Sequence, residues 1–258
     1  MKITFITGAA NGLGKEFAVL YGKDNNNLLL VDIDEVALIS VKEELSRMFP
    51  NIFIDTIVAD LAKEEELKRV YKYTLDKEYF VNNVVNAAGF GDRCDFKDMN
   101  IDKQLKMTYV DCNAVLYFTK VFLDEMLKHD EGHIINVASI AAFMPAPYMC
   151  TYHACKSYVL LLGESISYES RKTNVKCLTL CPGPFLSEFV SKAHNDYTFK
   201  KIKPVTASKV AEFGYKKSLK GKSLAIVGFK NRLTIFAARF APRKFVTKTS
   251  AKTMKKGD

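Results

Sequence analysis

The sequence predicts one α/β domain, built on a doubly wound parallel sheet of about seven strands with helices on both faces. Short apolar runs alternate with helix-length amphipathic stretches as far as about residue 228, which is the pattern of successive βαβ units. Runs such as residues 28–31 (LLLV) are apolar without alternation, as expected of strands that are buried on both faces. A chain of 258 residues, 48% of them hydrophobic, suits one such domain.

The expected elements follow one another along the chain without an internal repeat. The strand candidates are short apolar runs: Ile3–Thr7, Leu28–Asp32, Ile52–Val58, Val81–Asn86, His133–Ala138, Val175–Leu180 and Ser223–Val227. Helical patterns lie between them: Gly14–Tyr21, Glu35–Arg47, Lys63–Asp76, Asp102–Lys128 and Tyr152–Ser170. Ligands of such sheets bind outside the carboxyl ends of the strands, so we examine those ends most closely.

Charge and cysteine content exclude several classes of function. The net charge is +9, but residues 216–258 contribute +12 and the remaining 215 residues sum to −3. The basic excess belongs to the C-terminal segment, so it does not favour a nucleic-acid partner.

Six cysteines form no CxxC pair and have no histidine at zinc-finger spacing, so we expect no metal and reduced thiols. We expect a cytoplasmic protein, because the chain opens directly as a strand without a signal peptide or membrane span.

The first predicted strand runs into TGAANGLG (residues 7–14), and a helix follows at once. Gly8, Gly12 and Gly14 permit a tight turn, close approach of a pyrophosphate and close helix–strand packing. Asn11 and Leu13 complete the turn, and the helix N-terminus offers N–H groups to a phosphate. The spacing GxxxGxG departs from the general dinucleotide-binding pattern GxGxxG. If the three glycines were the only evidence, a tight turn without any ligand would explain them. Their placement between a strand and a helix favours a Rossmann-like dinucleotide site.

The second predicted strand ends at Asp32, twenty residues beyond Gly12. A carboxylate there can accept hydrogen bonds from the adenosine ribose hydroxyls and repels a 2′-phosphate. No Lys or Arg stands at position 33, and Asn11 precedes Gly12. We therefore predict NAD over NADP. The alternative is that Asp32 only caps the next helix, for which Asp34 is an equally good candidate.

Further motifs follow in a fixed order. Asp60 and Leu61 come after the third predicted strand, and NAAG (residues 86–89) ends the fourth. Ser139 stands thirteen residues before YHACK (residues 152–156), and Pro182-Gly183 follows the sixth strand. With the glycine turn, this order resembles the short-chain dehydrogenase/reductase family across about residues 1–230. The segments GFG (89–91) and FMPAPY (143–148) resemble its serine-dehydrogenase-like and hydroxysteroid-dehydrogenase-like branch.

The resemblance implies a set of cofactor contacts. Asp60 corresponds to a contact with adenine, and residues 86–89 to a segment that supports the central strands and lines the cofactor. Ser187 is the nearest match to a threonine that often contacts the nicotinamide amide in this family. Because a serine stands in place of the threonine, the resemblance leaves this one contact open. The predicted cofactor residues are Gly8, Asn11, Gly12, Leu13, Gly14, Asp32, Asp60, Leu61, Asn86, Ala87, Gly89, Tyr152, Lys156, Pro182, Gly183 and Ser187.

Tyr152 and Lys156 are four residues apart on a helical pattern, so their side chains share one face. A free phenol with a pKa of about 10 is a poor base, and a neighbouring ammonium lowers that pKa. We expect Tyr152 to act as the general acid/base while a hydride passes between a secondary alcohol or ketone and NAD(H). Ser139 would donate a hydrogen bond to the substrate oxygen, and Lys156 would also hold the nicotinamide ribose. By the resemblance, Asn113 corresponds to the family residue that holds a proton-relay water. An ordinary amphipathic helix would explain Tyr152 and Lys156 if they stood alone.

The segment Phe185–Pro204 is polar and irregular, which fits a lid over the substrate. Its candidate contacts are Phe185, Leu186, Phe189 and Tyr197. An apolar wall would accept a bulky apolar substrate, although core packing explains some of its members equally well: Ile140, Phe143, Met144, Tyr148 and Met149.

Residues 1–230 are assigned to the dinucleotide-binding and catalytic domain, and residues 231–258 to a basic C-terminal extension of it. Leu233, Phe236 and Phe240 recur at helical spacing in this extension. Such a face could lie on an anionic membrane surface; we favour its packing over the substrate side or a partner subunit. We expect a homodimer or homotetramer.

Two other functions are compatible with parts of the sequence. The first is a non-catalytic nucleotide-binding regulator, which would need the glycine turn but no acid–base pair. The combination of Asn113, Ser139, Tyr152 and Lys156 therefore argues against it. The second is a membrane-associated adaptor, for which the basic extension is the only support.

Overall fold

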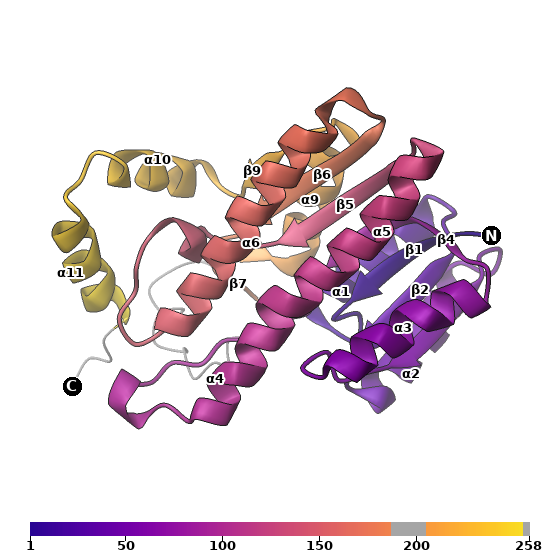
Figure 1. Ribbon diagram of the computed structural model, residues 1–258, viewed down its shortest axis with the longest axis horizontal. Coiled ribbons are helices and arrows are strands. Elements are labelled where there is room, and N and C mark those ends of the chain that lie inside the picture. Colours follow the sequence, from indigo (N-terminus) through magenta and orange to yellow (C-terminus); the bar gives the residue numbers. More distant parts are fainter. Residues whose placement is uncertain (187–204, 255–258) are drawn as a thin grey trace.

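A computed structural model describes residues 1–186 and 205–254. It confirms the predicted fold class: seven parallel strands form one sheet in the order β3-β2-β1-β4-β5-β6-β9 (Figure 1). Their bounds are β1 Lys2–Thr7, β2 Leu28–Asp32, β3 Ile54–Val58, β4 Phe80–Asn86, β5 Gly132–Val137, β6 Val175–Cys181 and β9 Leu224–Ile226. Two short strands, β7 (Phe185–Leu186) and β8 (Val205–Thr206), pair separately.

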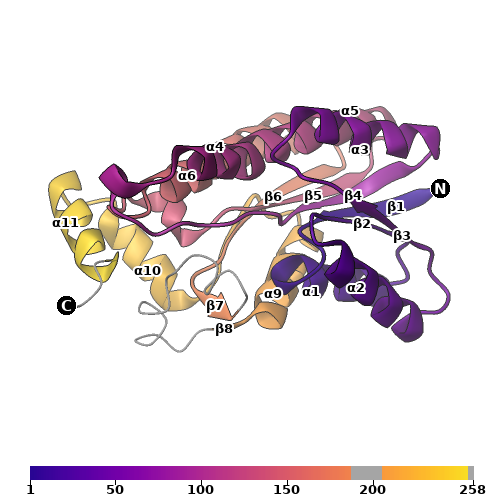
Figure 2. The ribbon, with the colours of Figure 1, turned by 90° about the horizontal axis from the view of Figure 1, so that it is seen from below.

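Helices cover both faces of the sheet, as Figure 2 shows. One layer contains α1 (Gly12–Lys23), α2 (Glu35–Met48) and α9 (Ala207–Leu219). The opposite layer contains α3 (Glu64–Asp76), α4 (Ile101–Thr108), α5 (Val115–His129) and α6 (Cys150–Glu169). The helix α9 was not assigned from the sequence; Thr206 caps it by accepting a hydrogen bond from the Lys209 amide at 3.4 Å.

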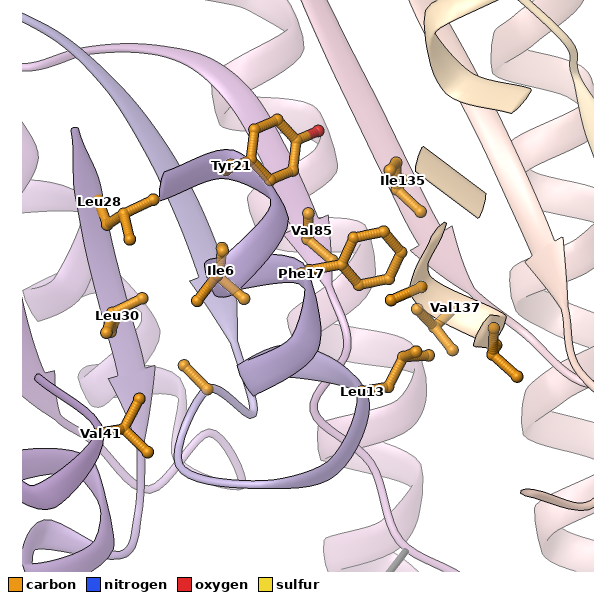
Figure 3. Packing of buried hydrophobic residues seen from close by; sticks show 14 of the residues in the cluster. Ile6, Leu13, Phe17, Tyr21, Leu28, Leu30, Val41, Val85, Ile135 and Val137 are labelled. Atoms are coloured by element: carbon orange, nitrogen blue, oxygen red, sulfur yellow. The ribbon is translucent and has the colours of Figure 1, made fainter. Parts of the chain in front are cut away.

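A separate hydrophobic core lies on each face of the sheet. Side chains of α1 pack on the strands of the first face, where Phe17 is buried in one cluster with Ile6, Val85 and Val137 (Figure 3). On the second face the ring of Phe5 lies 4.8 Å from the rings of both Phe118 and Phe122 of α5. Ile6 and Phe5 are neighbours in β1, so consecutive residues supply opposite cores. This double burial explains why the strands lack alternation.

From β1 the sheet is extended through β2 to β3 on one side and through β4, β5 and β6 on the other, so that the order of connection reverses between β1 and β4. In such sheets a ligand-binding crevice lies outside the carboxyl ends of the strands at this point. A buried polar cluster holds the neighbouring strands together. The amide nitrogen of Asn86 donates to Asn136 on β5 at 2.8 Å and to Thr119 on α5 at 3.1 Å. These bonds fix the end of β4 against β5 directly below the crevice.

The predicted helix Asp102–Lys128 is divided in the structure. A π-helical turn, Tyr109–Ala114, lies between α4 and α5. Such a turn inserts an extra residue into the helical phase and is frequent at functional sites. The basic extension forms two helices, α10 (Phe229–Ala238) and α11 (Arg243–Met254). Within the described ranges, every helix is too short or too polar to cross a membrane.

Candidate active site

The glycine turn joins β1 to α1 at the crevice. A Cβ atom on Gly14 would lie 2.1 Å from the carbonyl oxygen of Gly8, a separation that no side chain can adopt. Glycine at this position therefore lets α1 start directly against the turn. The first turn of α1 carries no acidic side chain, so its N-terminal N–H groups and positive dipole end can attract a phosphate.

Asp32 lies at the end of β2, beside the glycine turn. Its Oδ2 accepts a hydrogen bond from the Ala10 amide at 2.9 Å, and its Oδ1 accepts one from the Asp34 amide at 3.1 Å. Asp34 is the residue that caps α2, by accepting from the Ala37 amide at 3.0 Å. The alternative that Asp32 only caps this helix is therefore wrong. The carboxylate is held in place with lone pairs left over, which fits the two hydroxyls of a ribose.

Three other predicted cofactor residues, Asp60, Ala87 and Pro182, closely follow the carboxyl ends of β3, β4 and β6. Thr7 accepts hydrogen bonds from the amides of Ala87 and Ala88, each at 3.1 Å, which ties the segment after β4 to the end of β1. Asp60 accepts from the Ala62 amide at 3.1 Å. The carbonyl oxygen of Pro182 accepts from the Ile140 amide at 2.9 Å.

Some predicted side chains have roles in packing. Leu13 and Leu61 are buried in the two hydrophobic cores, so only their backbone atoms can reach a ligand. The side chain of Asn86 points into the buried cluster with Asn136 and Thr119. Ser187, Phe189 and Tyr197 lie outside the described residues.

Ser139, Tyr152 and Lys156 come together at the carboxyl edge of the sheet. Ser139 follows β5 and caps a short helix by accepting from the Ala141 amide at 3.1 Å. It also hydrogen-bonds Tyr152, which stands in the first turn of α6. The Nζ atom of Lys156 lies 5.7 Å from the centroid of the Tyr152 ring. This cluster places a hydroxyl, a phenol and an ammonium side by side.

Lys156 is buried and held from two sides. Its Nζ donates to the carbonyl oxygen of Val137 at 3.2 Å and lies 3.6 Å from Oδ1 of Asp111. Asp111 belongs to the π-helical turn and has no exposed surface. The second side of the ammonium therefore contacts a buried carboxylate, which is not among the residues predicted from the sequence.

The prediction for Asn113 is not supported by its position, because its side chain is exposed to solvent. It shares its helix face with Leu116 and Lys120, which are also exposed. Asp111 instead precedes the buried residues Val115 and Phe118 by four and seven positions. Helical spacing from the apolar residues downstream was therefore the signal that could have identified Asp111.

Gly89 makes room for this carboxylate. A Cβ atom on Gly89 would lie 2.3 Å from Oδ1 of Asp111 and 3.2 Å from Nζ of Lys156. The segment after β4 thus closes over the ion pair, and only glycine allows that approach. Its predicted contact with a cofactor and this steric role are compatible.

The pKa values of the cluster reflect burial and charge together. Burial raises the pKa of Asp111 to about 6, although the Lys156 ammonium opposes this shift. Burial lowers the pKa of Lys156, but the charges of Asp111, Tyr152 and nearby thiols outweigh it, so the net pKa is raised. Burial also raises the pKa of Tyr152; Lys156 lowers it, as predicted, and Asp111 raises it again. The net pKa of Tyr152 thus lies above its ordinary value, contrary to the expected decrease.

The histidine that follows Tyr152 in the sequence makes a structural contact. His153 is buried, and its Nδ1 lies 2.8 Å from the carbonyl oxygen of Met144. All six cysteines are free thiols. In the part of the chain that the structure describes, no three His, Cys, Asp or Glu side chains are grouped to hold a metal ion.

A doubly wound parallel sheet, a glycine turn after its first strand and a Ser–Tyr–Lys cluster at its carboxyl edge define the class of dinucleotide-binding α/β enzymes. The family model for short chain dehydrogenase matches residues 2–198. The chain therefore belongs to the short-chain dehydrogenase/reductase family of nicotinamide-dependent oxidoreductases, as the motifs predicted.

Known proteins support this assignment. An uncharacterized oxidoreductase of Staphylococcus aureus (strain MRSA252) is 27% identical over 203 residues, which are 79% of this chain and 86% of the relative. A short-chain dehydrogenase from Sphingobium yanoikuyae in complex with NADPH has a TM-score of 0.83 at 18% identity, with 93% of each chain covered. One from Burkholderia phymatum in complex with NAD has a TM-score of 0.82 at 22% identity, covering 91% of this chain and 92% of that chain.

Proposed function

We propose that the protein transfers a hydride between NAD(H) and a secondary alcohol or its ketone, with Tyr152 as the general acid/base. The observation that carries this proposal is the cluster of Ser139, Tyr152 and Lys156, which the segment after β4 connects to the glycine turn. A regulator that only bound a nucleotide would have no use for a buried ammonium held against a phenol.

The residues at the crevice fit a dinucleotide. The start of α1 would hold the pyrophosphate, Asp32 the adenosine ribose, and Lys156 the nicotinamide ribose. When bound, the nicotinamide ring supplies the acceptor or donor of the hydride. Asp32 supports a preference for NAD, because its carboxylate repels a 2′-phosphate and position 33 is Ile33. The two solved relatives contain NADPH in one case and NAD in the other, so the family alone leaves this choice open.

The geometry of the cluster supports the following proton transfers. In alcohol oxidation, Tyr152 takes the hydroxyl proton of the substrate, and in ketone reduction it returns a proton to the oxygen. Ser139 donates a hydrogen bond to the same oxygen. Lys156 stabilises the phenolate, which otherwise is disfavoured by burial. Asp111 balances the charge of Lys156 and keeps the ammonium protonated in its buried position.

The side chains next to Ser139 support a bulky apolar substrate. Ile140, Phe143, Met144 and Tyr148 are half-buried, and of the predicted apolar wall only Met149 is buried in the core. Phe185 of the predicted lid is also half-buried, in β7. We further propose that residues 1–230 form the catalytic domain of a cytoplasmic homodimer or homotetramer.

A substrate panel tests the proposal directly. Purified protein is mixed with NAD(H) or NADP(H) and a series of secondary alcohols and ketones of increasing bulk, and absorbance of the reduced nicotinamide is followed. We expect turnover with NAD(H) that depends on Tyr152. Cofactor binding without turnover of any alcohol or ketone would support the regulator instead.

A further inference from the structure

The helices α10 and α11 and the turn between them expose an apolar face to solvent. Its members are Phe229, Leu233, Phe236 and Phe240, together with Phe245 of α11, and their exposed fractions are 77%, 59%, 58%, 77% and 63%. The first four are spaced by four, three and four residues, so they lie along one side of a helical path. We call these five residues the apolar tail face. Phe236 and Phe240 are in ring contact, with centroids 5.3 Å apart.

The expected docking of this segment on the protein body occurs only in part. Ile235 is buried, but Leu233, Phe236 and Phe240 are largely exposed. The face also lines a shallow groove, in which Arg232 and Arg239 stand beside Leu233 and Phe236. Within the chain, the packing that we favoured from the sequence is therefore found for Ile235 and not for these three side chains.

The same helices carry a strong and uniform charge. Residues 229–254 contain seven Lys and Arg side chains and no Asp or Glu. A helix that combines exposed Phe and Leu with flanking Lys and Arg has the composition of helices that lie in the interface of an anionic bilayer. The apolar side chains enter the boundary between headgroups and acyl chains, while the cations meet the anionic headgroups.

Charge also argues against a second copy of the chain as the partner that covers the apolar tail face. A two-fold symmetric dimer places the same surface of both chains in contact. Two faces that carry only cations would then repel each other across the interface. An anionic partner relieves this repulsion, whereas a second copy of the face increases it.

The two ends of the segment are anchored at the candidate active site. The side chain of Asn231 lies where a Cβ atom on Gly183 would come within 2.5 Å of its nitrogen. At the other end, the side chain of Arg93 donates a hydrogen bond to the carbonyl oxygen of Met254 at 2.7 Å. Figures 1 and 2 show α10 and α11 together at one end of the molecule, far from α2. Contacts near both ends thus join α10 and α11 to the rest of the domain.

We propose that the apolar tail face binds the surface of an anionic lipid bilayer, without crossing it, and so brings the substrate side of the enzyme to the membrane. This inference does not depend on the proposed reaction, because it rests on exposed side chains and charge outside the Ser–Tyr–Lys cluster.

Co-sedimentation with lipid vesicles tests the proposal on the full chain. Vesicles of phosphatidylcholine are compared with vesicles that also contain phosphatidylglycerol, at about 0.05 M and about 0.5 M salt. We expect binding at least about tenfold stronger to the anionic vesicles, weakened by salt. The variant Leu233→Ser/Phe236→Ser should bind about tenfold more weakly or worse, because it removes two inserting side chains.

A matched control alters two exposed apolar residues on α2. Val36 and Ile39 are three positions apart and are 81% and 47% exposed. Val36→Ser/Ile39→Ser should bind vesicles as the wild type does. Thermal unfolding and NADH binding of both double variants, compared with the wild type, show whether each is folded.

Three results would overturn the proposal. The first is failure of the folded wild type to sediment with anionic vesicles. The second is loss of binding in Arg232→Gln/Arg239→Gln without any loss in Leu233→Ser/Phe236→Ser, which would indicate attraction to polyanions in general. The third is a decrease in molar mass by light scattering in Leu233→Ser/Phe236→Ser, which would show that a second copy covers the face.

Discussion

The ammonium of Lys156 lies 3.6 Å from a carboxylate oxygen of Asp111, and both side chains are buried beneath the candidate active site. A buried charge is strongly disfavoured unless a partner compensates it. Each member of this pair therefore allows the other to remain charged. Because Tyr152 also lies beside Lys156, the charge state of Asp111 is coupled to the proton-transfer group.

The first prediction concerns the pH dependence of the reaction. Asp111 raises the pKa of Tyr152, so Asp111→Asn should lower it. Alcohol oxidation needs the phenolate, and its rate increases as pH rises through this pKa. The ascending limb of kcat/KM for oxidation should therefore move to lower pH in Asp111→Asn. Asp55→Asn is the control, since Asp55 accepts hydrogen bonds from Tyr73 and Tyr79 away from the cluster. A limb that stays in place or moves to higher pH would contradict the coupling.

The second prediction concerns stability. The Asp111 carboxyl has a pKa of about 6 in the folded protein and an ordinary value of 3.8. The folded state therefore holds an extra proton between these values, and stability is lost as pH rises through this window. The unfolding free energy of the wild type, relative to Asp111→Asn, should fall by roughly 2–3 kcal/mol between about pH 4 and about pH 7. Urea unfolding at several pH values measures this difference. A difference that is flat or grows with pH would show that Asp111 is ionised throughout.

The sequence predicted those parts of the site that depend on local pattern. The glycine turn, Asp32 and the Tyr152–Lys156 spacing each lie within one turn, strand end or helix. In the structure Asp32 contacts the glycine turn, Lys156 lies beside Tyr152, and the segment after β4 approaches both Gly8 and Lys156. Parallel strands must end at the same edge, which is why short motifs far apart in the chain could be combined.

The errors arose where tertiary contacts decide the outcome. The π-helical turn changes the helical phase between α4 and α5, so Asp111 and not Asn113 faces Lys156. The sign of the net pKa shift of Tyr152 depends on burial, which no spacing reveals. The helical pattern of the extension correctly indicated one apolar face, but only the structure shows that this face points to solvent.

The third prediction separates proton transfer from cofactor binding. Tyr152→Phe removes only the hydroxyl group, so turnover should fall by at least about a thousandfold while NADH affinity stays nearly unchanged. Lys156→Ala should impair both, because the ammonium stabilises the phenolate and would hold the ribose. Stopped-flow turnover and NADH fluorescence titration measure the two effects. Substantial activity in Tyr152→Phe would exclude the proposed general acid/base.

The fourth prediction concerns the choice of cofactor. Asp32→Ala should lose discrimination mainly by weakening NAD(H) binding, since the ribose hydroxyls lose their acceptor. Ile33→Arg should improve NADP(H) binding, because a guanidinium pairs with a 2′-phosphate. Dissociation constants for both reduced cofactors test these changes, with Asp34→Asn as a control that keeps a capping oxygen at the start of α2. Tighter binding of NADPH than of NADH by the wild type would contradict the assignment of Asp32.

The last prediction concerns how the C-terminal helices are held. Ile235 is 4% exposed, whereas Leu233 on the same helix is 59% exposed. Truncating a buried Ile to Ala costs about 2–5 kcal/mol, and about 1 kcal/mol lowers the melting temperature of a domain of this size by about 2–4 °C. Ile235→Ala should therefore lower the melting temperature by several degrees, and Leu233→Ala should leave it unchanged. Truncation after Gly228 should lower it at least as much as Ile235→Ala, since it also removes the hydrogen bond between Arg93 and Met254. Equal melting temperatures for the wild type and the truncated chain would show that α10 and α11 contribute nothing to the stability of the domain.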